Sequence, residues 1–172
     1  MKCLLKTIIA IVLIVVIGGL LLWFVGFPAL LAEDKVVKNL EKQDYEVQTF
    51  NSDDLFGAVG LFMPEGAKTL VSASKGDLGD DRDSISIYYF DETKDAKNAK
   101  ESLEKEFNES IDALIEELTP DEDSTLNDMM SSVTSDMIAN LEQTRKDTKF
   151  VRFGKIFVVG SVRGIVTAMT GF

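Results

Sequence analysis

Histidine is absent from this chain, and its single cysteine, Cys3, lies near the N-terminus. Because of these absences, an intrachain disulfide, Ser-His and Cys-His catalytic pairs, and zinc sites that contain histidine are all excluded. A Ser-Lys dyad or a pair of carboxylates remains chemically conceivable, but the spacing singles out no such pair. The sequence therefore disfavours an enzyme, and a hydrolase without histidine is retained only as a second alternative.

Positive charge is scarce as well. The chain has 18 basic and 29 acidic residues, and every acidic residue follows Ala32. Since Lys2 and Lys6 precede that point, the segment 33–172 carries 16 basic and 29 acidic residues, a net charge of 16 − 29 = −13. A surface of this sign repels phosphate groups, so it excludes nucleic-acid binding and a polybasic contact with anionic lipids.

The glycines and aromatic residues form no cofactor motif. No stretch matches either glycine-rich nucleotide fingerprint, and the aromatic side chains are not interleaved with basic ones in the way that base stacking requires. The sequence therefore predicts no cofactor, with Ca²⁺ as the one exception considered below.

An uncharged apolar run of 26 residues, 7–32, dominates the N-terminal part. At about 1.5 Å per residue, a helix of this length crosses a hydrocarbon core of roughly 30 Å with some tilt. Its length favours an uncleaved transmembrane signal anchor over a cleaved signal peptide, whose apolar region is about 7–15 residues long. A buried or hairpin element is the third interpretation. Typical members of the predicted span are Ile8, Ile11, Leu21, Trp23 and Phe27.

The lysines on either side of this run bear on its orientation in the membrane. Lys2 and Lys6 precede the run, and three lysines within 35–42 follow it, so the count of basic residues is nearly balanced. A very short basic head before a first apolar helix is typical of a signal anchor. We therefore expect a single-pass protein of the cell membrane with a cytoplasmic N-terminus and an extracytoplasmic C-terminal domain.

The rest of the chain divides into a stalk and one domain. Val36, Val37 and Leu40 have helical spacing, which predicts a juxtamembrane stalk over 33–43. Alternating residues over 45–50 then predict a strand. The switch of period places the start of a soluble acidic domain at residue 44, and this domain runs to residue 172.

Within the domain, the pattern predicts strands and helices in separate runs. Strands are expected at 57–63, 68–74, 84–90, 150–153 and 156–159. Helices are expected at 92–118, from near Pro120 or after Ser124 to at least Leu141, and at 162–169 with Ser161 as its cap. This order predicts an α+β fold, in which the N-terminal transmembrane helix is followed by an antiparallel sheet with helices packed on one face.

The loop between the second and third of these strands is the best metal candidate. Asp77, Asp80, Asp81 and Asp83 are close together on a glycine-containing loop, and carboxylate oxygens suit a hard cation such as Ca²⁺. The alternating acidic positions and distant Glu of an EF-hand loop are missing. Because Asp and Gly are also common turn residues, an ordinary hairpin loop is the competing interpretation.

Three methionines on the second long helix are the candidate contact residues for a partner. Met129, Met130 and Met137 lie on its apolar stripe, and flexible thioethers suit an adaptable binding surface. Filling of the core is the competing use. The first hypothesis is thus a membrane-tethered domain that binds a protein partner. The alternative is an extracytoplasmic sensor or a small-ligand or Ca²⁺-binding module with a pocket between sheet and helices.

Overall fold

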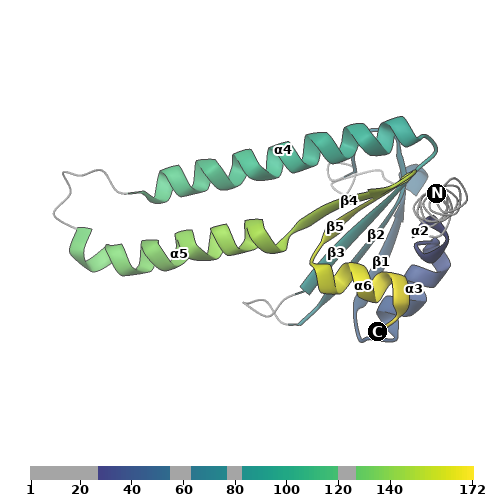
Figure 1. Cartoon of the computed structure of the whole chain (residues 1–172), viewed down its shortest axis with the longest axis horizontal. Helices are drawn as coiled ribbons and strands as arrows, with labels where there is room; N and C mark the ends of the chain where they lie inside the picture. The colour runs from purple at the N-terminus through teal and green to yellow at the C-terminus, as the bar shows by residue number, and fades with distance from the viewer. Residues whose placement is uncertain (1–26, 55–62, 77–82, 120–126) are drawn as a thin grey trace, which may run out of the picture.

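The computed structural model describes residues 27–54, 63–76, 83–119 and 127–172, and for 27–28, 54 and 127–132 it gives the backbone only. These residues form an α+β fold with a five-stranded antiparallel sheet (Figure 1). In chain order, the elements are α2 (Phe27–Leu30), α3 (Glu33–Glu41), β1 (Glu46–Asn51), the short 3₁₀ turn η2 (Ser52–Asp54), β2 (Ala67–Lys75), β3 (Asp83–Phe90), α4 (Thr93–Leu118), α5 (Asn127–Asp147), β4 (Lys149–Phe153), β5 (Ile156–Gly160) and α6 (Val162–Thr170).

The sheet has the strand order β1-β2-β3-β5-β4, and every neighbouring pair is antiparallel. The strands predicted at 45–50, 68–74 and 84–90 and the C-terminal hairpin are confirmed to within about two residues at each end. Gly154 turns that hairpin with a φ of 61°, a conformation that glycine adopts readily. The strand predicted at 57–63 falls almost entirely outside the described residues.

Helices cover both faces of the sheet. On one face, Val71, Ile87 and Val158 pack in a cluster with residues of α3 and α6. On the other face, Tyr88 and Phe157 pack in a second cluster with the first turns of α4. The prediction that helices lie on one face only is therefore wrong. The reason is that β3 and β5 carry apolar side chains at successive positions, which point to opposite faces, so both faces need cover.

The helix predicted as a stalk, α3, is part of this core. Leu31, Val36 and Leu40 are all 0% exposed. Polar contacts attach the same segment to the C-terminal part of the chain. Asn39 Nδ2 donates to the carbonyl oxygen of Ala168 at 2.9 Å, and Gln43 Nε2 donates to that of Gly171 at 3.0 Å. The folded core thus includes Leu31 and the buried side of α3.

Within the part of the chain that the structure describes, no helix has the length and hydropathy to cross a membrane. Four of the residues named for the predicted span, Ile8, Ile11, Leu21 and Trp23, lie in 1–26, outside the described residues. The fifth, Phe27, is the first residue of α2. The membrane span therefore stays a prediction.

Candidate functional site

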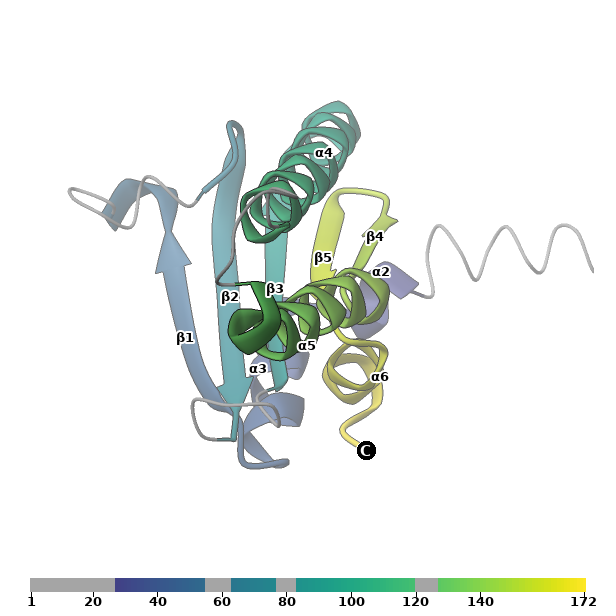
Figure 2. The same ribbon diagram turned by 90° about the vertical axis from the view of Figure 1, so that its left-hand side faces the viewer.

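The long helices α4 and α5 form an antiparallel pair that extends past the end of the sheet (Figure 1; seen along the helix axes in Figure 2). The first turns of α4 lie on the sheet, where Ala96 and Ala99 are buried. Phe107 is the last aromatic contact along this interface, with its ring centroid 5.4 Å from that of Phe150 on β4. We call the part beyond it, residues 109–119 of α4 and 133–144 of α5, the arm.

The arm is held together by one buried side chain and by polar contacts at its base. Ile111 is only 5% exposed. Arg145 forms an ion pair with Asp112, and its guanidinium also donates to the carbonyl oxygen of Asn108. Along α4, ion pairs such as Lys105 with Glu109 join residues four apart and support the helix.

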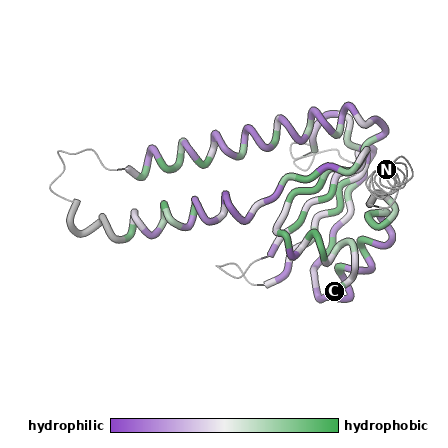
Figure 3. Tube along the Cα trace, in the orientation of Figure 1, coloured by the Kyte–Doolittle hydropathy of each residue, from purple (hydrophilic) through white to green (hydrophobic). Residues whose placement is uncertain are grey.

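The arm leaves large apolar side chains in contact with water. Leu114 is 46% exposed, Val133 58% and Met137 49%. A pair of helices buries only the sides that face each other, and apolar residues recur along both helices of the arm (Figure 3). Of the three methionines predicted to contact a partner, Met137 is therefore on the surface rather than in the core. The side chains of Met129 and Met130 are outside what the structure describes.

All formal side-chain charges on the arm have the same sign. No Lys or Arg occurs between Lys105 and Arg145. Glu109, Asp112, Glu116 and Asp136 are exposed there. The stretch 106–144, which has no Lys or Arg, can be read from the sequence. The net charge of the whole domain does not reveal it. The arm therefore combines exposed apolar groups with formal charges of one sign, of which Glu109 and Asp112 are paired with Lys105 and Arg145 at its base.

Asp83, one of the four candidate metal ligands, has both carboxylate oxygens engaged by protein groups. Tyr45 donates its hydroxyl hydrogen to Oδ2 at 2.5 Å, and Ser161 donates to Oδ1 at 2.7 Å. Ser161 Oγ also accepts from the backbone N–H of Gly164 at 2.8 Å, which makes it the N-cap of α6 as predicted. Burial raises the pKa of Tyr45 to about 12, and the hydrogen bond and charge of Asp83 act in the same direction.

The other three candidate ligands, Asp77, Asp80 and Asp81, lie outside the described residues. Within the described ranges, no group of three or more Cys, Asp or Glu side chains is placed to hold a metal ion. The contacts of Asp83 give it a structural use that the spacing of the acidic residues did not reveal. Ca²⁺ binding by this loop stays a prediction.

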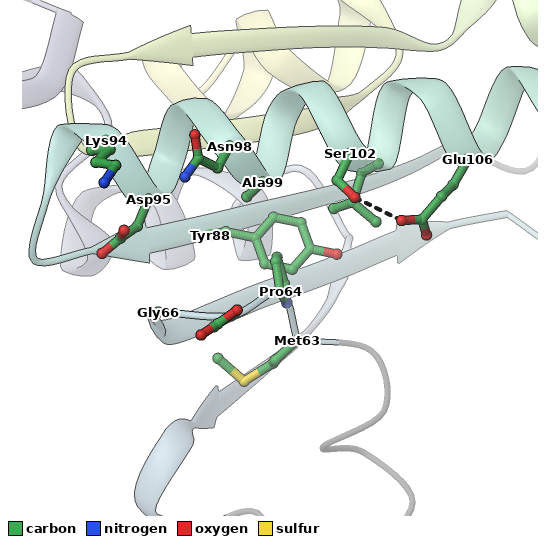
Figure 4. A pocket seen from close by; sticks show the side chains of 12 residues that line it. Met63, Pro64, Gly66, Tyr88, Lys94, Asp95, Asn98, Ala99, Ser102 and Glu106 are labelled. Atoms are coloured by element: carbon green, nitrogen blue, oxygen red, sulfur yellow. Dashed lines mark hydrogen bonds between the residues drawn. The ribbon is translucent and has the colours of Figure 1, made fainter.

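A cleft of about 830 Å³ opens between α4, the segment 63–66 that precedes β2, and Tyr88 of β3 (Figure 4). Its apolar lining comes from Met63, Pro64, Tyr88, Ala99 and Leu103. Its polar lining is formed by Glu65, Lys94, Asp95, Asn98, Ser102 and Glu106. The ring of Tyr88 lies at the centre of the view, and burial raises the pKa of its hydroxyl. The cleft thus offers an aromatic floor with charges of both signs around it.

A second cleft, of about 630 Å³, lies between the C-terminal half of α5 and the strands β3 and β5. Small polar side chains line most of it, among them Ser84, Ser86, Thr144 and Thr148. Asp83 and Ser161 also border it, but the hydrogen bonds described above already occupy them.

Comparison of the chain with protein-family models, curated proteins and solved structures gave no match. The function is therefore inferred from the chain's own geometry.

Proposed function

We propose that this chain is a single-pass membrane protein whose acidic domain, outside the cytoplasm, binds a protein partner through the arm. The observation that carries the proposal is the exposure of Leu114, Val133 and Met137 on a helix pair that extends past the sheet. Exposed apolar side chains on a projecting element are typical of interaction sites. The uncharged run at 7–32 supports the membrane anchor.

The charge of the arm indicates which kind of partner segment fits it. A helix that lays an apolar face against two helices is a common mode of recognition. The charged side chains of the arm are all negative. A partner segment that has basic residues next to its apolar residues is therefore favoured, and an acidic segment is repelled. A second copy of this chain would bring two acidic arms together, so self-association through the arm is disfavoured.

The test is site-specific crosslinking in the full chain, expressed in the cells it comes from. A photoreactive amino acid at Met137 is expected to join the arm to one dominant protein, whose yield falls at least about tenfold when Val133→Asp is added. Position 162 is the matched control, because Val162 is as exposed as Val133, at 58%, but lies on α6. The absence of a crosslink at 137, or the same products from 137 and 162, would contradict the proposal.

The cleft in Figure 4 favours a second candidate function, a sensor or small-ligand module. An aromatic floor with a few polar groups is the usual composition of a ligand site. A screen of amino acids and short peptides by thermal shift tests it. A ligand is expected to raise the melting temperature of the unmodified chain but not of a Leu103→Asp variant, because that substitution puts a charge in the lining of the cleft.

A further inference from the structure

The last helix, α6, buries apolar side chains on its inner side and also exposes two on its outer side. Its inner side packs into the core, where Ile165 and Ala168 are 8% and 0% exposed. Its outer side presents Val162 and Val166, which are 58% and 47% exposed. A surface helix normally has a polar outer side, and a helix that is apolar all round normally has cover on every side. The outer side of α6 therefore exposes two large apolar side chains beside the polar side chains of Arg163 and Thr170.

The segment that contains α6 also differs in charge from the rest of the domain. The stretch 161–172 has no acidic residue, although the segment 33–172 contains all 29 acidic residues of the chain. Its only charged side chain is that of Arg163. The repulsion from anionic surfaces that applies to the domain as a whole is therefore weak here. An apolar contact with lipid also needs no polybasic cluster.

The position of α6 relates this apolar side to the predicted anchor. α6 packs on α3 and also contacts α2, the helix into which the apolar run leads. Leu30 of α2 is itself 42% exposed. In Figure 1, α2, α3 and α6 are grouped at the end of the molecule opposite to the arm. The exposed apolar groups of α2 and α6 thus lie where the chain would leave a membrane.

We propose that the outer side of α6, with Val162 and Val166, lies against the lipid headgroup region of the bilayer that anchors the chain. This inference rests on the membrane anchor of the proposed function and is independent of the arm. A contact of two valines is weak by itself, but the anchor makes it intramolecular, and the high effective concentration then favours it.

The test uses the full chain in phosphatidylcholine vesicles, with Cys3→Ser and one new cysteine that carries a nitroxide spin label. The label is placed at Val166→Cys, or at Val133→Cys on the arm as the matched control. Power-saturation electron paramagnetic resonance then compares the access of oxygen, which concentrates in lipid, with that of a water-soluble nickel chelate. The ratio of oxygen to nickel access is expected to be several-fold higher at 166 than at 133.

Adding Val162→Asp to the chain labelled at 166 is expected to return the ratio to the value found at 133, because a charge then replaces part of the apolar contact. Equal ratios at 166 and 133 would overturn the proposal. So would a label at 166 that neither reagent reaches, since a second copy or residues 1–26 would then cover α6. Flotation of the same vesicles separates this failure from loss of the anchor: a chain that does not float has no anchor, and both proposals fall.

Discussion

Tyr45 and Asp83 are joined by a hydrogen bond of 2.5 Å, although 38 positions separate them in the chain. The contact connects the segment between α3 and β1 to the first residue of β3. Through the second carboxylate oxygen, Ser161 attaches the start of α6 to the same point. One carboxylate therefore fixes the relative positions of three elements around the core formed by α3, α6 and the sheet.

The first prediction concerns the hydroxyl group of Tyr45. We expect Tyr45→Phe to lower the free energy of unfolding by about 1–2 kcal/mol at pH 7, because a hydrogen bond to a charged group is lost. The pKa of about 12 in the folded state lies above the ordinary value of 10.0. The stabilisation is therefore complete below about pH 10 and is lost as the pH rises through 12.

Urea unfolding between pH 7 and 12 measures both effects. The loss of stability above pH 10 is expected to be shallower in Tyr45→Phe than in the unmodified chain. Tyr88 and Tyr89, whose pKa values burial also raises, contribute an alkaline loss that both proteins share. Parallel curves for the two proteins above pH 10 would show that Tyr45 does not titrate in this way.

The second prediction separates a structural from a metal-binding use of Asp83. Asp83→Ala leaves the hydroxyl groups of Tyr45 and Ser161 without their acceptor, so we expect a loss of about 2 kcal/mol or more. The loss should be the same in a chelator and in millimolar Ca²⁺. A loss seen only with Ca²⁺, measured by thermal unfolding, would instead support the predicted calcium loop.

The third prediction concerns the boundary of the folded domain. A chain that begins at residue 44 lacks Leu31, Val36 and Leu40, each of which is 0% exposed in the core. Losing even one buried leucine costs about 2–5 kcal/mol, so we expect this chain not to unfold cooperatively. A chain that begins at residue 27 retains α2 and α3 and is expected to show one sharp thermal transition. Equal transitions for both chains would place α3 outside the cooperative core.

The fourth prediction compares the arm with the core. We expect Val133→Asp to change the free energy of unfolding by less than about 0.5 kcal/mol, because Val133 is largely in water. Phe157→Ala is expected to cost about 3–5 kcal/mol. Phe157 is 0% exposed, and its ring centroid lies 5.6 Å from that of Tyr88 and 6.4 Å from that of Phe150. Denaturant unfolding gives both values, and a large loss for Val133→Asp would mean that the arm packs on something in the isolated protein.

Local periodicity was sufficient to predict most of the elements. The helix at 92–118 and the strands at 68–74 and 84–90 have patterns that identify their type, and Ser161 is the cap that the sequence suggested. The predicted one-sided cover failed because Ile87 and Tyr88 are neighbours in sequence and point to opposite faces. Both faces of this strand are packed, since Ile87 and Tyr88 belong to different buried clusters.

For the candidate sites too, the sequence suggested the residues, and the packing showed how each one is placed. Met137 was a candidate partner contact with core filling as the competing use, and it is 49% exposed because α5 extends past the sheet. Its contact with a partner stays a prediction. The engagement of Asp83 by Tyr45 and Ser161 was not predictable, because it joins residues 38 and 78 positions apart. The exposed side of α6 was hidden for a similar reason: its valines look like core residues until the packing of α3 shows which side of the helix is inside.

By itself, the sequence determined the α+β class, the type of most elements, the acidic character and the absence of histidine chemistry. These properties are local or compositional, since helix and strand periods and charge are carried by residues close together in the chain. The tertiary structure decided which apolar stripes are buried, which carboxylate is occupied and where the arm projects. Those properties depend on contacts between residues that are distant in sequence. Such contacts form only when the helices pack on both faces of the sheet.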